Sequence, residues 1–279
     1  MKRDNYYQHT QYRDYVDLKK LDFIIRNVKK IIRNDRNNQG KVMDIGCGSG
    51  NIAIPLASLS YKVLAIDCEC KSIEYVKEQA IQKGLLEKMR FMVGDVQKLD
   101  MKDSFDAIIC SEVLEHLQDP STVLARMKKV LKKNGVLLLT TPNGFGPYEM
   151  RKVVIPKMKK ISVQLRKILK GLLKAAGLFN LIKKLKGSIV ITENVISNPF
   201  TPECSTFNFN SPHVQRFTIR GLKIMLRENG FHILKIRNSD FLAVGNLRHK
   251  RWVSRLDCKL ADLLPHFLVS GWYLVCRRK

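Results

Sequence analysis

The sequence lacks long apolar runs, paired cysteine motifs and an N-terminal apolar leader. No segment reaches the roughly 18 to 20 unbroken apolar residues of a membrane span, so we expect no transmembrane helix. Residues 1–20 contain no apolar h-region, which argues against a cleaved secretory signal. The seven cysteines are scattered and include no C-x-x-C pair. This usage is typical of reduced thiols, and we therefore expect a cytoplasmic protein.

Acidic residues are scarce relative to basic ones. The 279 residues include 50 Lys and Arg against 25 Asp and Glu, which gives a formal net charge of +25. Such a surface attracts polyanions, whether nucleic acid, anionic lipid or a phosphorylated substrate, although a merely solvated basic surface is the simpler interpretation. The apolar fraction of 45% excludes a disordered chain and suits a sizeable core.

Short apolar runs alternate with helical patterns in the first half of the chain. The predicted strands are residues 41–46, 62–67, 89–95, 105–111 and 135–142, with later strands at 232–238 and 272–278. The predicted helices are residues 14–33, 51–60, 72–84 and 121–135, with a later one at 218–230. Strands covered by helices on both faces have such continuous apolar runs. We therefore predict an α/β fold with a doubly wound, seven-stranded and mostly parallel sheet.

A glycine-rich turn, DIGCGSG at residues 44–50, follows the first predicted strand, where open α/β sheets bind ligands. No Lys-Ser or Lys-Thr follows Gly50, as a P-loop would require, and the glycines are too closely spaced for G-x-G-x-x-G. The Asp44 carboxylate would repel a pyrophosphate by about 4 kcal/mol at roughly 4 Å, but it would attract a cation. The turn therefore favours S-adenosylmethionine, which carries an ammonium and a sulfonium and no phosphate.

Several motifs, taken in order, resemble those of the class I S-adenosylmethionine-dependent methyltransferases. They are DIGCGSG at 44–50, Asp67, GD at 94–95, SEVLEHL at 111–117, TPNG at 141–144 and HVQRFT at 213–218. The set is most similar to the branch that includes ubiquinone O-methyltransferases and glycan- and lipid-pathway methyltransferases. The resemblance covers residues 40–145 closely and 205–235 more loosely. It implies the Rossmann-like methyltransferase fold.

The resemblance also implies a cofactor site. The residues expected around the methionine moiety are Asp44, Gly46, Cys47, Gly48 and Gly50. Asp67 would bind both ribose hydroxyls, and Asp95 with the backbone amide of Val96 would bind the adenine. Ser111 and Glu112 would form the floor of the site. For Asp67 and Asp95 the alternative role is to hold a turn at the end of a strand.

The catalytic candidates are Glu112, His116 and His213. Methyl transfer is an in-line displacement that needs alignment and, for a hydroxyl acceptor, a base. If residues 111–117 begin a helix, Glu112 and His116 are neighbours one turn apart, with Glu115 beside them. We predict His116 or His213 as the base; the alternative is that Glu115 and His116 form a structural pair. These groups also suit a divalent cation, as in RNA 2′-O-methyltransferases acting on small-RNA ends, but we predict no metal requirement.

A basic segment interrupts the predicted fold. Residues 151–186 carry 12 Lys and Arg and no Asp or Glu, with apolar residues at helical spacing. We expect an amphipathic helix that lies on an anionic membrane or covers the acceptor pocket as a lid. The predicted organisation is an N-terminal helix and cofactor-binding core at 1–150, a basic helical insertion at 151–197 and the C-terminal part of the fold at 198–279.

The predicted function is methylation that depends on S-adenosylmethionine. The expected acceptor is a small molecule, of a lipid-linked, glycan or quinone type, that is O-methylated by a cytoplasmic protein peripheral to a membrane. RNA is an alternative acceptor because its phosphates would use the same charge, but basic motifs interleaved with aromatics are absent. A non-catalytic binding module with the same fold is the remaining alternative.

Overall fold

The computed structural model describes residues 14–32, 40–98, 102, 104–150, 213–242 and 250–278. None of the helices in these ranges is both long enough and apolar enough to cross a lipid bilayer. The predicted basic helix at 151–186, and with it the insertion at 151–197, lies outside the described residues and stays a prediction.

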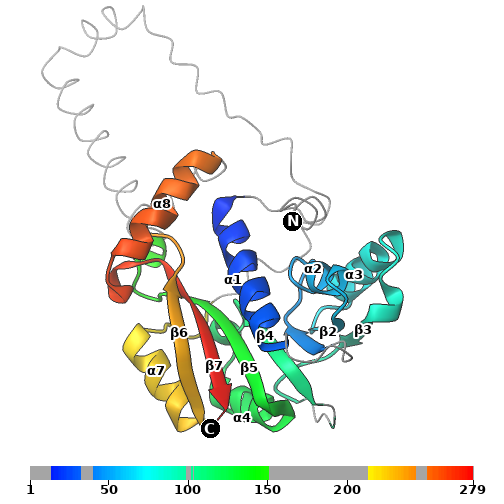
Figure 1. The fold of residues 1–279 in the computed structure, drawn as a ribbon. Coiled ribbons are helices and arrows are strands. Elements are labelled where there is room, and N and C mark those ends of the chain that lie inside the picture. The colour runs from blue at the N-terminus through cyan, green and yellow to red at the C-terminus, as the bar shows by residue number, and fades with distance from the viewer. Residues whose placement is uncertain are drawn as a thin grey trace, which may run out of the picture. The chain divides into compact units, whose positions relative to one another are not determined.

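Seven strands form one sheet in the order β3-β2-β1-β4-β5-β7-β6 (Figure 1). Their bounds are β1 Lys41–Ile45, β2 Lys62–Asp67, β3 Met89–Val93, β4 Phe105–Ser111, β5 Leu131–Pro142, β6 Phe231–Asn238 and β7 Gly271–Arg278. Neighbours among β1 to β5 pair in parallel, whereas β7 is antiparallel to both β5 and β6. The predicted seven-stranded, mostly parallel sheet is confirmed.

Helices connect most of the strands. The α-helices are α1 Tyr15–Ile32, α2 Ala53–Ser58, α3 Cys70–Gln82, α4 Pro120–Val130, α7 Ile219–Glu228 and α8 Arg251–Leu263. The 3-10 helices are η1 Leu86–Lys88, η2 Leu114–His116 and η4 His266–Leu268. Helix α4 starts where Asp119 accepts a hydrogen bond from the Thr122 amide (3.1 Å), with Pro120 in the first turn. It ends at Val130 and not near Gly135 as predicted, because β5 already begins at Leu131.

Apolar side chains from alternate strand positions fill two cores, one on each face of the sheet. On β5, Leu137 and Leu139 face the core shared with α4 and α7, whereas Val136 and Leu138 face the core shared with α1, α2 and α3. This alternation follows from the two-residue period of a strand. Both faces being covered explains why the strand sequences are almost continuously apolar.

A buried lysine links α1 to α8. Lys19 is 5% exposed, and its Nζ donates to the carbonyl oxygens of Ser239 (2.7 Å) and Cys258 (3.1 Å) and to Asp262 (2.9 Å). The ammonium has three protons, so these three acceptors satisfy it. Lys19 therefore attaches both α8 and the chain that follows β6 to α1.

We expect Lys19→Met to lower the free energy of unfolding by roughly 2 to 4 kcal/mol, because it removes the partner of two backbone carbonyls and a partly buried carboxylate. Urea denaturation would measure the change. Lys30→Met, on the exposed side of α1, is the matched control and should change stability little. Equal stability of the two variants would contradict this role of Lys19.

Candidate functional site

The turn after β1 leaves space beyond the carboxyl-terminal ends of the parallel strands. Gly46 and Gly48 have φ values of 65° and 49°, which residues with a side chain rarely adopt. A Cβ on Gly46 would also lie 2.5 Å from Cγ2 of Val113, whereas a Cβ on Gly48 would meet nothing within 4 Å. Gly50, with a φ of 76°, completes the predicted pattern. The backbone at Gly48 can therefore be approached closely by a ligand.

Asp44 is a buried carboxyl next to this turn. Its side chain is 1% exposed, and Oδ2 has no hydrogen-bond partner within the described part of the chain. Desolvation, partly offset by the Ala53 amide and reinforced by the charge of Asp67, raises the pKa of Asp44 from 3.8 to about 7. A cation would supply the missing partner and favour the ionised form. The residues therefore fit the positively charged amino-acid end of S-adenosylmethionine.

Cys47 and Asp67 hold the turn against β2. The Cys47 amide donates to the Ile66 carbonyl (2.9 Å), and burial raises the pKa of the Cys47 thiol, which keeps it protonated. Asp67 accepts from the amides of Gly48 (2.9 Å) and Glu69 (2.9 Å), one on each oxygen. This is the turn-holding role. A carboxylate has about four acceptor positions, so two remain for ribose hydroxyls, and that role stays a prediction.

Asp95 lies in a turn at the end of β3. Its Oδ1 accepts from the Gln97 amide (2.9 Å), and its carbonyl accepts from the Lys98 amide (2.9 Å). Val96 is half-buried against the core. The amide of Gly94 donates to the Asp67 carbonyl (2.9 Å), which brings this turn next to the end of β2. The proposed adenine contacts of Asp95 and Val96 are not tested by this geometry.

Thr140 of β5 links Ser111 and Glu112, the two residues predicted to form the floor of the cofactor site. Ser111 Oγ lies 2.9 Å from Thr140 Oγ1, which donates to Glu112 Oε1 (2.8 Å). Since Thr140 has a single hydroxyl proton, Ser111 must donate to Thr140. Glu112 has a φ of 56°, unusual for a residue other than glycine, and its amide donates to the Thr140 carbonyl (3.0 Å). The contacts to β5 hold Glu112 in this strained conformation.

The predicted helix at 111–117 is wrong. The segment forms only η2, Leu114–His116, and the positive φ of Glu112 interrupts the backbone before it. Glu112 and His116 are therefore not neighbours on a helix face. Among the described residues, the group of metal-capable side chains that gathers at this place consists of Glu115, His116 and His213, without Glu112.

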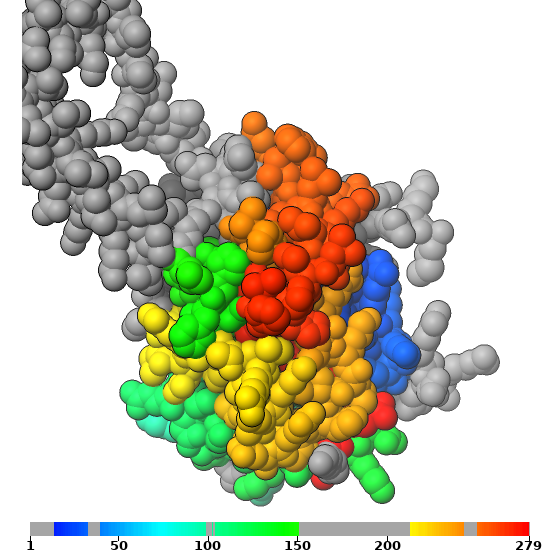
Figure 2. All heavy atoms as spheres, turned by 90° about the vertical axis from the view of Figure 1, so that its left-hand side faces the viewer, coloured from blue at the N-terminus to red at the C-terminus, as the bar shows by residue number. Residues whose placement is uncertain are grey.

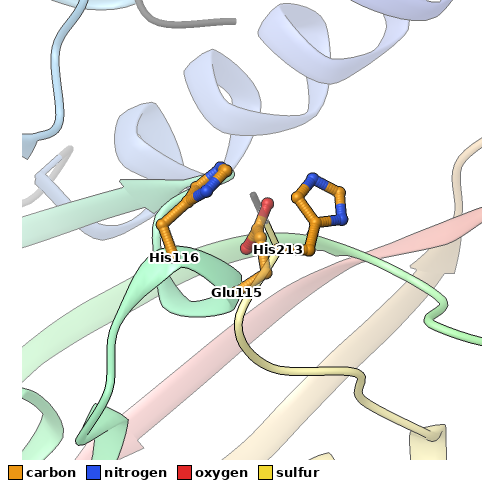
Figure 3. A group of neighbouring side chains, drawn as sticks. All are labelled: Glu115, His116 and His213. Carbon is orange, nitrogen blue, oxygen red and sulfur yellow. The ribbon is translucent and has the colours of Figure 1, made fainter. Parts of the chain in front are cut away.

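The backbone brings His213 to Glu115 and His116, about a hundred residues earlier in the chain. The Glu115 carbonyl accepts from the amides of Val214 (2.8 Å) and Gln215 (2.9 Å). Potential ligand atoms of the three side chains then lie within 4.8 Å of one another, and the two imidazole ring centroids are 5.0 Å apart. Figure 3 shows the Glu115 carboxyl between the two imidazoles. This cluster can transfer a proton or bind a divalent ion.

The electrostatics of the cluster depend on Glu115 and Glu149. Glu115 is 1% exposed; its Oε2 accepts from the Thr141 hydroxyl (3.1 Å), and its Oε1 has no hydrogen-bond partner in the described residues. Desolvation and the charge of Glu112 raise its pKa well above 4.5. His213 Nδ1 lies 3.5 Å from Glu149 Oε1, which can stabilise a protonated imidazole.

Sequence reasoning assigned no role to Thr140, Thr141 or Glu149, although Thr141 begins the TPNG motif. The two threonines end an apolar strand run, GVLLLTTP, and a polar pair at the carboxyl end of a buried strand was a usable signal. No sequence pattern indicated Glu149.

We expect EDTA to leave methyl-transfer activity unchanged. Desolvation and the charge of Glu112 raise the pKa of Glu115 and so oppose its ionisation, and a metal would have to displace its proton. A methyl-transfer assay before and after chelation, with Mg²⁺ or Mn²⁺ added back, measures this. Loss of activity that either ion restores would show that the cluster holds a required metal.

Comparison with known proteins relates the chain to a family. The sequence model of the family described as "Methyltransferase domain" matches residues 36–192, more than half of the chain. The ubiquinone biosynthesis O-methyltransferase of Pelagibacter ubique is 35% identical over 122 residues, which are 44% of this chain and 48% of that protein. The chain thus spans about half the length of the curated relatives it matches.

Two solved structures share the fold over nearly the whole chain. An S-adenosylmethionine-dependent methyltransferase from Clostridium acetobutylicum aligns with a TM-score of 0.55 and 14% identity, covering 94% of this chain and 92% of that one. Magnesium protoporphyrin IX methyltransferase from Synechocystis, solved with bound SAH, aligns with a TM-score of 0.50 and 17% identity, covering 94% and 84%. At this identity the likeness shows the fold.

Proposed function

The chain belongs to the methyltransferase-domain family, and on that premise we propose that it transfers a methyl group from S-adenosylmethionine to a hydroxyl oxygen of a quinone-type or other lipid-linked acceptor. The observation that carries the proposal is the buried Asp44 carboxyl beside the glycine turn, one oxygen of which has no hydrogen-bond partner among the described residues. Asp44 lies at the carboxyl-terminal end of the parallel strands, the same end of the sheet that bears the Glu115, His116 and His213 cluster.

Each group has a defined task. When bound, S-adenosylmethionine supplies a methyl group on its sulfonium. The acceptor oxygen attacks the methyl carbon on the side opposite the sulfur, which leaves as the thioether of S-adenosylhomocysteine. Asp44 binds the positive amino group, and the turn that Asp67 holds lets the backbone at Gly48 approach the ligand. His213, or His116 beside it, takes the proton that the acceptor hydroxyl loses as its oxygen–carbon bond forms. Glu149 stabilises the resulting imidazolium of His213.

The acceptor class is inferred from the relatives. Among them are the ubiquinone biosynthesis O-methyltransferases, whose name supports a quinone-type acceptor. A lipid-linked or glycan acceptor also suits the cluster of Glu115, His116 and His213, because the base contacts only the hydroxyl group that is methylated. We further propose that the protein is cytoplasmic and peripheral to a membrane; the basic composition of residues 151–186 supports this.

The test is methyl transfer from S-adenosylmethionine with a labelled methyl group. We expect label to enter a hydroxylated aromatic acceptor with a prenyl tail and to be recovered as a methyl ether in the lipid extract. RNA is tested in parallel, because the net charge of +25 also favours a polyanion. Label in RNA alone would replace the proposed acceptor, and transfer to neither would favour a binding module.

A further inference from the structure

Helix α8 carries apolar side chains on its outward face, where a surface helix normally carries polar ones. Trp252, Leu256, Leu260 and Leu263 are 66%, 57%, 44% and 83% exposed. They are separated by four, four and three residues, so they form one row along the helix. The residues that α8 buries are instead small or polar: Ser254, Asp257, Cys258 and Ala261.

Hydrogen bonds hold α8 in place. Besides the contacts of Lys19, Asp257 accepts from the Leu242 amide (2.9 Å). At the end of the helix, Asn238 Nδ2 donates to the carbonyls of Ala261 (2.6 Å) and Leu264 (2.9 Å). The outward apolar row is not needed for this attachment and is available to a partner.

A basic row runs beside the apolar one. Arg251, Arg255 and Lys259 are exposed and recur every four residues. The two acidic residues of α8 do not offset them: Asp257 is buried, and Asp262 is paired with Lys19 (2.9 Å) and with an arginine of β6 (3.2 Å). The outward face of α8 is therefore apolar and cationic.

The outward face of α8 lies at the same end of the sheet as the candidate site, where β5 ends. Exposed Phe267 and Leu268 in η4 continue the apolar surface beyond α8. Asn143, directly after β5, donates to the carbonyls of Phe267 (3.1 Å) and Val269 (2.8 Å), and β5 also supplies the Thr141 that contacts Glu115. Figure 2 shows α8 in orange above the red segment that leads into β7, with green residues that follow β5 beside it.

We propose that the outward face of α8, together with η4, docks on an anionic lipid bilayer. A row of apolar residues that includes tryptophan, beside a row of arginine and lysine, is the composition of an interfacial helix. The apolar side chains enter the boundary between head groups and acyl chains, and the basic row pairs with lipid phosphates. This inference rests on the proposed function and deepens it, because a docked enzyme would meet a lipid-linked acceptor at the end of the sheet that bears the candidate site.

Charge distinguishes the bilayer from other occupants. A two-fold dimer that packs the α8 helices antiparallel through this face would place the basic row of one copy against that of the other. Residues 151–186 of the same chain carry 12 basic and no acidic residues, so they too would be repelled. A nucleic acid would pair with the basic row and stack a base on the tryptophan, but it would gain little from the three leucines.

Flotation of the full-length protein with vesicles tests the proposal without S-adenosylmethionine or acceptor, so its failure is separate from a failure of methyl transfer. We expect the protein to float with vesicles of phosphatidylcholine and phosphatidylglycerol but not with phosphatidylcholine alone. Trp252→Ser/Leu256→Ser/Leu260→Ser should abolish flotation. Arg251→Gln/Lys259→Gln should weaken it by about tenfold or more.

The matched control is Ile81→Ser/Leu86→Ser/Ile224→Ser, which removes three similarly exposed apolar side chains elsewhere and should float like the wild type. Since all these side chains are exposed, thermal melting should change little. Flotation of the α8 serine variant at the wild-type level would place membrane binding elsewhere and overturn the proposal. Failure of the wild type to float, or a lipid-free dimer that the serine variant converts to a monomer, would overturn it as well.

Discussion

Asp44→Asn should weaken S-adenosylmethionine binding by about 2 to 5 kcal/mol, the usual cost of removing one partner from a buried charge pair. The substitution keeps the size of the side chain but removes the charge that a ligand cation would meet at Oδ2. Isothermal titration calorimetry with S-adenosylmethionine measures the loss. The wild type should bind NADH far more weakly, because the same carboxylate repels its pyrophosphate.

The same substitution should stabilise the ligand-free protein at high pH. The pKa of Asp44 rises from 3.8 to about 7 on folding, so the folded state holds a proton that the unfolded state has lost. Stability is therefore lost as pH rises from about 4 to about 7, by as much as roughly 4 kcal/mol at 1.36 kcal/mol per pKa unit. Asp44→Asn lacks this loss, which denaturation at several pH values would show.

Ligand affinity should follow the opposite pH trend. Below about pH 7 the Asp44 carboxyl must release its proton before it can bind a cation, so affinity should fall by up to about tenfold per pH unit. The ligand's own amino group keeps its proton up to about pH 8. Asp22→Asn, on α1, is the control and should bind like the wild type. Unchanged binding by Asp44→Asn would show that the carboxyl faces no ligand cation.

His213→Ala should lower kcat by about 10²- to 10⁴-fold, the range for loss of a general base. Its Nδ1 faces Glu149 at 3.5 Å, and this carboxylate would stabilise the positive charge that His213 gains. The affinity for S-adenosylmethionine should not change, because neither histidine lies at the glycine turn. Steady-state kinetics with a hydroxyl acceptor, together with calorimetry for the cofactor, separate the two effects.

Two variants sharpen this test. His116→Ala should lower kcat less than His213→Ala, and His232→Ala, on the exposed side of β6, should leave it unchanged. A fall of less than tenfold for both His213→Ala and His116→Ala would assign both histidines to a structural role.

The sheet and the glycine turn were predictable because their causes are local. Each strand is a short apolar run, and burial on both faces of the sheet requires that pattern wherever the strand lies in the fold. The positive φ of Gly46 and Gly48 is likewise a property of the turn itself. Asp44 could be assigned to the turn from its position in the sequence. Only the packed structure shows that one of its oxygens has no hydrogen-bond partner in the part of the chain that it describes.

Other features depend on distant parts of the chain. His213 reaches Glu115 through backbone hydrogen bonds across about a hundred residues. The resemblance to a family grouped the two residues, but no local pattern in either segment predicts their contact. The helix predicted at 111–117 fails because contacts with β5 hold Glu112 at a positive φ. Helix α8 escaped prediction because its apolar row faces outward, so its pattern does not identify a side that packs on the core.

The position of β7 has a consequence for the order of folding. In the sheet β7 lies between β5 and β6, although it follows both in the chain. Strand β6 has no pairing with β5, so it can join the growing sheet only after β7 has paired. During synthesis the strands up to β5 can assemble first, which would order the glycine turn early. Strand β6 joins the sheet only through β7. A nascent chain that lacks β7 would expose the unpaired edges of β5 and β6 to wrong partners.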